Sequence, residues 1–117
     1  MLPARVLPHE EAHLRILKIV SGEPNISQRQ LAVRLGISLG KTNFLIRSLL
    51  EKGLIKAGNF KRSKNKLQYA YLLTPKGIIE KIRLARAYLA RKEAEYEALE
   101  AEIRGLKQEM RSSDEFR

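Results

Sequence analysis

The spacing of apolar residues in the C-terminal third of the chain is the feature that most constrains the fold. No helix breaker other than the isolated Gly77 and Gly105 stands between Pro75 and about Ser112, which predicts one helix of roughly 55 Å at about 1.5 Å per residue. Positions spaced alternately by four and three residues form an apolar stripe, broken only by Lys92: Ile78, Ile82, Ala85, Leu89, Lys92, Tyr96, Leu99, Ile103, Leu106 and Met110. This is the a and d pattern of a coiled coil over more than four heptads.

The stripe has two possible uses. It can pack against the rest of the chain as far as Leu89, but the preceding body is too small to cover all of it. Self-association therefore explains the stripe better. We expect a homodimer whose contact residues are Leu89, Tyr96, Leu99, Ile103, Leu106 and Met110.

Charges beside the stripe favour one orientation of this dimer. A parallel, in-register pair would place Lys81 against Arg86 and Glu95 against Glu100. An antiparallel pair would instead set the basic half of the helix against the acidic half. We therefore favour an antiparallel coiled coil.

Charge also divides the chain as a whole. The 117 residues carry a formal charge of +10. Residues 1–92 hold 19 basic and 5 acidic side chains, a net of +14, whereas residues 93–117 hold 4 basic and 8 acidic side chains, a net of −4. A basic body with an acidic tail indicates a polyanionic partner for the body and a separate task for the tail.

Composition excludes several classes of protein. The chain has no cysteine, which removes disulfides, thiolate zinc sites and thiol redox sensing. Pro3 and Pro8 interrupt the N-terminal segment before it reaches signal-peptide length, and no stretch approaches the roughly 20 apolar residues of a membrane span. We expect a cytoplasmic protein without membrane contact or cofactor.

Three helices are predicted before the long one, over residues 9–22, 28–35 and 39–52. Ser27 and Ser38 are N-cap candidates for the second and third helices, and a glycine follows each of these two helices. Two helices joined by a short glycine-containing turn form a helix-turn-helix. The expected core of the body is Leu14, Leu17, Leu31, Leu35, Ile46, Leu49 and Leu54.

Two antiparallel strands are predicted next, within residues 54–60 and 67–74. The second strand alternates, which places Leu67, Tyr69, Tyr71 and Leu73 on one face. Between the strands lies a basic run that contains Lys61, Arg62, Lys64 and Lys66. At a hairpin tip that follows a helix-turn-helix, such cations suit phosphates or the minor groove. Thr74 and Pro75 then suit the N-cap and first position of the long helix.

The third helix has an inward and an outward face. Thr42, Leu45, Ile46, Leu49 and Leu50 would pack inward, while Gly40, Asn43, Phe44 and Arg47 share the opposite face, with Lys41 beside them. Arginine pairs with guanine, asparagine pairs with adenine, and an aromatic ring touches the thymine methyl. Gly40 permits close approach, and the N-terminus capped by Ser38 favours a phosphate. This helix is our candidate for reading the major groove.

The order of these elements is that of a winged helix. The stretch ISQRQLAVRLGISLGKTNFLIRSLLEKGLIKAG, followed by YLLTPKG, resembles the MarR family of bacterial transcriptional regulators, and more narrowly the short members associated with exopolysaccharide gene clusters. The resemblance covers about residues 10–80. It implies a regulator in the bacterial cytoplasm, at the nucleoid, that binds double-stranded DNA and controls polysaccharide genes. Typical members have a longer C-terminal helical region that forms much of their effector site, so the resemblance identifies no effector here.

A formal match to the zinc peptidase pattern H-E-x-x-H occurs at His9–His13. A working zinc site needs a third protein ligand, and the chain has two histidines and no cysteine. Glu10 and Glu11 are explained by their favourable position at a helix N-terminus. We expect neither a metal site nor enzymatic activity.

These features together predict a mainly helical protein with a small β-hairpin. The expected division is a flexible N-terminus (1–8), a winged helix-turn-helix (9–75), a long dimerisation helix (76–112) and a disordered tail (113–117). The expected function is sequence-specific binding of double-stranded DNA by a dimeric regulator. The alternatives are a protein-interaction adaptor that uses the same two parts without reading DNA and, third, an RNA-binding protein.

Overall fold

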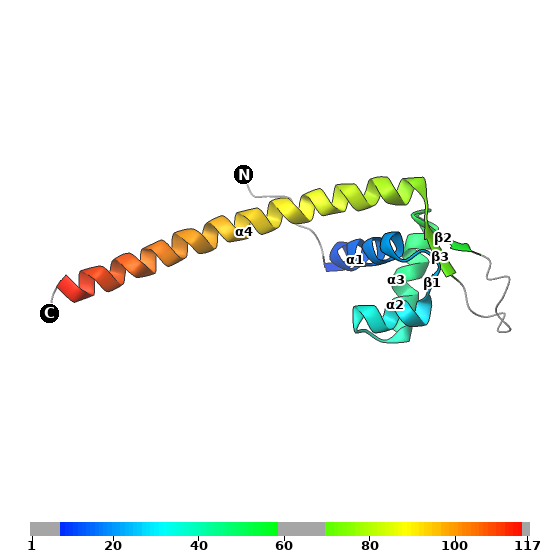
Figure 1. Ribbon diagram of the computed structural model, residues 1–117, viewed down its shortest axis with the longest axis horizontal. Coiled ribbons are helices and arrows are strands. Elements are labelled where there is room, and N and C mark those ends of the chain that lie inside the picture. Colours follow the sequence, from blue (N-terminus) through cyan, green and yellow to red (C-terminus); the bar gives the residue numbers. More distant parts are fainter. Residues whose placement is uncertain (1–7, 59–69, 116–117) are drawn as a thin grey trace.

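The structure is a computed structural model that describes residues 8–58 and 70–115. In chain order the elements are α1 (Pro8–Gly22), β1 (Ile26–Ser27), α2 (Gln28–Leu35), α3 (Leu39–Glu51), β2 (Ile55–Gly58), β3 (Ala70–Leu73) and α4 (Pro75–Glu115). The first three helices and the strands form a small body, and α4 runs along this body and then far beyond it (Figure 1). The predicted fold class is confirmed: a winged helix-turn-helix followed by a long C-terminal helix.

Side-chain caps set where α2 begins and ends. The backbone N–H of Gln30 donates to Ser27 Oγ at 3.2 Å, and the backbone N–H of Ser27 donates to Gln30 Oε1 at 3.0 Å. This reciprocal pair satisfies two donors that the start of a helix would otherwise leave without a partner. Gly36 ends the helix in the left-handed region at φ 68°.

The three strands form one antiparallel sheet in the order β1-β3-β2. Ile26 pairs with Tyr71, and Ile55 pairs with Leu73. The sequence did not predict β1, because two residues are too few to show an alternating pattern. On β3, Tyr71 is buried and the half-buried Leu73 packs against the core, whereas Leu67 and Tyr69 lie outside the described residues.

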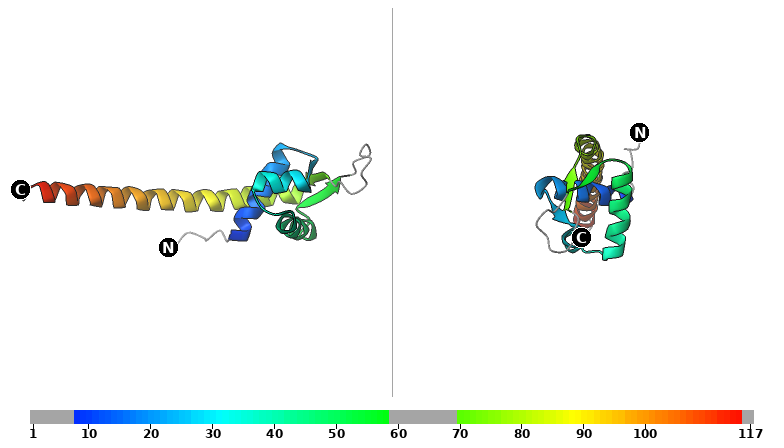
Figure 2. Two further views of the ribbon diagram at one scale, coloured as in Figure 1. Left: turned by 90° about the horizontal axis from the view of Figure 1, so that it is seen from below. Right: turned by 90° about the vertical axis from the view of Figure 1, so that its right-hand side faces the viewer.

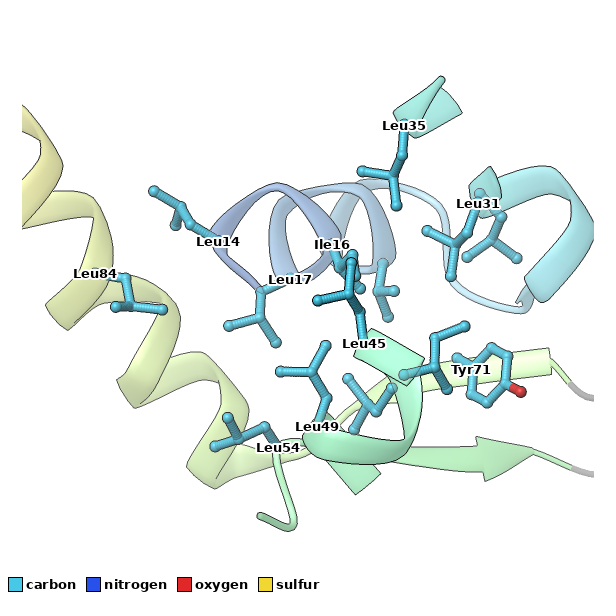
Figure 3. Packing of buried hydrophobic residues seen from close by; sticks show 14 residues of the cluster. Leu14, Ile16, Leu17, Leu31, Leu35, Leu45, Leu49, Leu54, Tyr71 and Leu84 are labelled. Atoms are coloured by element: carbon cyan, nitrogen blue, oxygen red, sulfur yellow. The ribbon is translucent and has the colours of Figure 1, made fainter. Parts of the chain in front are cut away.

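The core lies between α1, α2, α3 and the sheet, and the first part of α4 closes it. All seven residues predicted for the core are buried. Leu84 joins them and points from α4 toward Leu14 and Leu17 on α1 (Figure 3).

The junction between the sheet and α4 is tied to the end of α3. Thr74 Oγ1 donates to the carbonyl of Gly53 at 2.6 Å and accepts from the backbone N–H of Gly77 at 3.0 Å, as an N-cap side chain does. The backbone N–H of Thr74 donates to the carbonyl of Leu54 at 3.1 Å. Gly77 is buried against this same segment, so the first turn of α4 starts in close contact with the body.

Polar contacts hold α1 against α4. Arg91 Nη1 donates to Glu11 Oε1 at 2.8 Å, and Lys81 Nζ donates to Ser21 Oγ at 2.9 Å. Beyond its contacts with α1, α4 leaves the body and continues alone, as the left view in Figure 2 shows. None of the helices in the described ranges is apolar enough over a sufficient length to cross a membrane.

Two predicted boundaries differ from the structure. α1 begins at Pro8, which was assigned to the flexible N-terminus. α4 continues through Glu115, three residues beyond Ser112 and into the segment predicted to be disordered. The reason is that Ser113 and Asp114 break a helix only weakly when no glycine or proline accompanies them.

Candidate nucleic-acid interface

In the helix-turn-helix, α3 lies along one side of the body with one face buried and the other exposed. Ser38 caps its start, since Ser38 Oγ accepts from the backbone N–H of Lys41 at 3.1 Å. Thr42 Oγ1 donates to the carbonyl of Ser38 at 2.9 Å and closes the first turn from the buried side. At the other end, Gly53 takes a φ of 70° and turns the chain into β2.

The two faces of α3 divide largely as predicted. Thr42, Leu45, Ile46 and Leu49 are buried. Leu50 was expected inward, but it is 36% exposed, because it lies at the end of the helix and on the flank of the buried face. Outward-facing and exposed side chains are those of Ser38, Lys41, Phe44 and Arg47, with Gly40 beside them at the N-terminal end.

Phe44 stands out within this surface. Its side chain is 73% exposed, although burial of an aromatic ring of this size ordinarily contributes to folding. Lys41 and Arg47 are exposed on the same helix. An exposed ring between two cations has no role in the core. It suits contact with DNA, a polyanion whose major groove presents the apolar methyl group of thymine.

Asn43 is held differently from its neighbours. It is half-buried, and its Nδ2 donates to Gln28 Oε1 at 3.0 Å. The Gln28 amide also donates to the carbonyl of Leu39 at 3.5 Å. Gln28, the first residue of α2, therefore orients the Asn43 amide at the centre of the candidate surface. Gln28 was not predicted as a site residue from the sequence, because this contact arises only when the turn folds α2 back across the start of α3.

The other predicted cations lie outside the described residues. These are Lys61, Arg62, Lys64 and Lys66. The strands on either side of them, β2 and β3, pair with each other through four residue pairs. A contribution of the four cations to the interface stays a prediction.

The two histidines near the N-terminus occupy different environments. His13 is buried and His9 is exposed, and their rings meet edge to face with centroids 5.9 Å apart. Burial lowers the pKa of His13, and the charges of Lys52 and His9 act in the same direction. Within residues 8–58 and 70–115, no three His, Cys, Asp or Glu side chains are placed to share a metal ion. The environment of His13 is that of a core residue.

Comparison with known protein families identifies a DNA-binding fold in the part of the chain that contains α3. The model of the family described as winged helix-turn-helix DNA-binding matches residues 10–56, which include most of α1 and all of α2 and α3. No significant match occurs among curated proteins.

Solved structures are similar over most of the chain. The PcaV transcriptional regulator from Streptomyces coelicolor, in complex with its natural ligand, superposes with a TM-score of 0.65 at 18% identity, over 71% of this chain and 57% of that one. A MarR transcriptional regulator from Methanosarcina mazei gives 0.63 at 23% identity, over 72% and 59%. FabT from Streptococcus pneumoniae, in complex with DNA, gives 0.58 at 17% identity, over 91% and 76%.

The chain thus spans less than two thirds of the length of the PcaV and Methanosarcina chains. At these identities the likeness concerns the fold. The chain carries a winged helix-turn-helix of the kind found in MarR transcriptional regulators.

Proposed function

We propose that this chain is a transcriptional regulator of the MarR type that binds double-stranded DNA sequence-specifically and acts as a homodimer without enzymatic activity. The outward surface of α3 is the observation that carries the proposal: Lys41, Phe44 and Arg47 are exposed along one helix, and Asn43 is oriented among them by a hydrogen bond. The match to a DNA-binding family and the likeness to FabT, whose structure contains DNA, support it. Control of polysaccharide genes rests on the sequence resemblance alone.

Each residue of α3 has a role in this proposal. Arg47 pairs with guanine O6 and N7, and the Asn43 amide pairs with adenine N6 and N7. Phe44 contacts a thymine methyl. At the start of α3, the end capped by Ser38 carries the positive end of the helix dipole, which favours a phosphate, and Gly40 lets that phosphate come close.

Alanine substitutions in α3 test the proposal. Asn43→Ala and Arg47→Ala should each weaken binding to the operator by about 1–3 kcal/mol and relax the preference at one base pair. Arg104→Ala removes the same charge as Arg47→Ala from an exposed position on α4 and is the matched control. If operator binding is the same in all three variants, α3 does not read DNA, and the adaptor becomes the better assignment.

The wing has its own test. Lys61, Arg62, Lys64 and Lys66 are proposed to contact phosphates, so replacing them with glutamine should weaken binding to all sequences alike. The slope of log K against log salt should fall by nearly one for each lost contact. An unchanged slope in the fourfold variant would remove these residues from the interface.

Dimerisation is proposed to occur through α4. Leu89, Tyr96, Leu99, Ile103, Leu106 and Met110 are all at least 42% exposed along one side of this helix. An exposed apolar surface of this length, interrupted only by Lys92, is unusual on a monomer. One winged helix reads only a few base pairs, and two bodies joined through α4 would read two half-sites.

A further inference from the structure

The first half of α4 has two different apolar faces. One face, with Leu84 at its centre and Tyr88 and Gly77 on either side, packs on the body. The apolar stripe lies beside this face and stays at the surface even where the body is present: Ile78 is 46% exposed and Ile82 is 45% exposed. Of the stripe positions that could have packed on the body as far as Leu89, only Ala85 does so, at the edge of the contact. Apart from Ala85, the stripe thus stays exposed from Ile78 to Met110.

The spacing of the stripe makes it complementary to itself when it is reversed. In an antiparallel coiled coil, each a residue of one helix lies opposite a d residue of the other. With the two-fold axis at residue 94, all ten positions find such a partner. In this arrangement Ile78 faces Met110, Ile82 faces Leu106, Ala85 faces Ile103, Leu89 faces Leu99, and Lys92 faces Tyr96. No stripe residue is left over at either end.

We propose that the stripe packs against the same stripe of a second copy of this chain. The two α4 helices run antiparallel, and the two-fold axis of the dimer passes at residue 94. This register deepens the dimer of the proposed function, on which it rests, and it adds Ile78, Ile82 and Ala85 to the interface. The end of each α4 then lies beside the body of the other protomer.

Charges on both sides of the stripe support this register. At the flanking positions, Lys81 lies opposite the partner's Glu109, and Arg86 lies opposite the partner's Glu100. Each of these attractive pairs occurs twice. Glu93 and Glu95 each lie opposite themselves and repel once, and Glu95 has Lys92 Nζ at 3.2 Å and Arg91 Nε at 3.1 Å within its own chain.

A parallel, in-register pair is less favourable by the same comparison. It would place Lys81 against the partner's Arg86 and Glu95 against the partner's Glu100, with each repulsion occurring twice, and only Glu102 with the partner's Lys107 would attract. It would also put Lys92 against its own copy inside the seam. The antiparallel register instead gives Lys92 an aromatic partner, since Tyr96 lies opposite. Lys92 already has its Nζ 5.3 Å from the ring centroid of Tyr88 in its own chain, a cation–π contact of the same kind.

The surface of the stripe contains hollows that could receive side chains from a facing helix. One shallow hollow lies among Tyr96, Leu99 and Ile103, and the next lies among Ile103, Leu106 and Met110. Hollows between successive a and d residues are the holes that receive knobs from a facing helix. Ile79, which is 70% exposed beside the stripe, lies opposite the partner's Lys107, whose aliphatic stem can cover it.

The register also sets the distance between the two bodies. Each body contacts α4 around Leu84, ten residues from the axis. The two contact regions would thus lie about 30 Å apart along the rod at about 1.5 Å per residue. Half-sites one turn of DNA apart are separated by about 34–36 Å, which is of the same order.

Single cysteines test the register in the full chain, because the natural sequence has none. Leu89→Cys and Leu99→Cys should form a disulfide with each other when the two variants, one carrying a size tag, are mixed and oxidised without DNA. Leu89→Cys alone should not, since residue 89 lies about 15 Å from its own copy along the rod and a disulfide needs Cα atoms within about 7 Å. Ile82→Cys should likewise pair with Leu106→Cys.

Ile82→Cys mixed with Leu99→Cys is the matched control. These positions are seven residues, about 10 Å, out of register and should cross-link at least tenfold more slowly than the Ile82–Leu106 mixture. A wild-type chain that sediments as a monomer at micromolar concentration would overturn the proposal. Rapid cross-linking of Leu89→Cys alone would show a parallel pair, and preferential cross-linking of the control would show a shifted register.

Lys92→Leu gives a second and independent test. A single polar residue inside a coiled-coil seam specifies orientation at a cost in affinity. The variant should therefore dimerise at least tenfold more tightly, and Leu89→Cys in this background should begin to cross-link with itself. Weaker dimerisation would place Lys92 outside the seam. Because none of these measurements uses DNA, their failure is distinguishable from a failure of Asn43→Ala and Arg47→Ala to affect operator binding.

Discussion

Gly77 shows at the scale of one residue how closely α4 approaches the body. A Cβ atom built on it would lie 1.9 Å from the carbonyl oxygen of Leu54 and 2.9 Å from the carbonyl carbon. Both are backbone atoms of the segment that joins α3 to β2, so they have little freedom to move. We therefore expect Gly77→Ala to lower the free energy of unfolding by about 1–3 kcal/mol, as overpacking typically does.

Gly105 provides the control for this prediction on the same helix. An added Cβ there would meet nothing within 4 Å. Gly105→Ala should raise the stability by about 0.5–1 kcal/mol, because alanine favours a helix more than glycine does. Urea unfolding at one fixed protein concentration measures both variants. Equal effects of the two substitutions would mean that α4 does not press on Leu54.

His13 gives a second prediction at this scale, on pH. Burial, followed by the charges of Lys52 and His9, lowers the pKa of His13 from its ordinary value of 6.5 in the folded chain. The unfolded chain then binds the proton more tightly, so the stability that neutral His13 contributes is full above pH 6.5 and is lost as the pH falls below it. The loss is at most about 1.4 kcal/mol for each pH unit.

Unfolding at pH 7.5 and 5.5 checks this prediction. His13→Gln removes the titrating group, and its free energy of unfolding should change less between the two pH values than that of the wild type. His9→Gln removes the exposed imidazole and with it only a lesser cause of the lowered His13 pKa, so this variant should keep most of the wild-type pH dependence. An identical pH dependence in wild type and His13→Gln would contradict the assignment.

At the scale of elements, the local signals in the sequence predicted most boundaries. Ser27, Ser38 and Thr74 cap the helices that follow them, because a cap depends on residues only three positions apart. Contacts between distant segments were not predictable in this way. The pairing of β1 with β3 and the hydrogen bond from Asn43 to Gln28 both require the tertiary fold before any pattern exists.

The stripe of α4 illustrates the same limit. Its period was visible in the sequence, but a period does not show which neighbouring face packs on the body. Leu84 and Tyr88 take that role, each one residue away from the stripe positions Ala85 and Leu89. The choice depends on how Thr74 and Gly77 contact Gly53 and Leu54 at the first turn. The sequence predicted Thr74 as a cap but not these contacts with the body.

The contact between α2 and α3 supports a third prediction. Gln28 holds the Asn43 amide through one hydrogen bond of 3.0 Å. Gln28→Ala should therefore weaken operator binding by about 0.5–1.5 kcal/mol, even without a DNA contact of its own, because Asn43 loses its preferred orientation. The loss should fall on the base pair that Asn43 reads.

A double-mutant cycle distinguishes this effect from a loss of folding. If Gln28 acts through Asn43, the Gln28→Ala and Asn43→Ala effects on operator binding should be less than additive. Arg29→Ala, at the next and exposed position of α2, is the control for a general change in this turn. Full additivity would show that Gln28 contributes independently of Asn43.

The elongated shape of the molecule places the proposed DNA-reading surface and the proposed dimer contact far apart. The chain extends 76 Å along its longest axis, and the body occupies one end of it (Figure 1). The core of the body includes Leu84 but no stripe residue beyond Ala85, which packs on its edge. The part of α4 that leaves the body can therefore be altered without unfolding the body, and this independence makes the role of the dimer testable.

Leu99→Gln combined with Ile103→Gln should convert the proposed dimer to a folded monomer. Each substitution buries an unpaired amide in the seam and removes an apolar side chain, and each occurs twice in the dimer, so the dissociation constant should rise at least a hundredfold, about 3 kcal/mol. Ala98→Gln with Ala101→Gln adds the same amides at exposed positions outside the stripe and should leave the dimer intact.

The monomer should keep weak binding to any DNA through its cations but lose specific affinity for an operator with two half-sites. Sedimentation and a binding assay on that operator measure both properties. A variant that stays dimeric would place the contact elsewhere, such as on α1, whereas a monomer with full operator affinity would show that α4 serves a different partner.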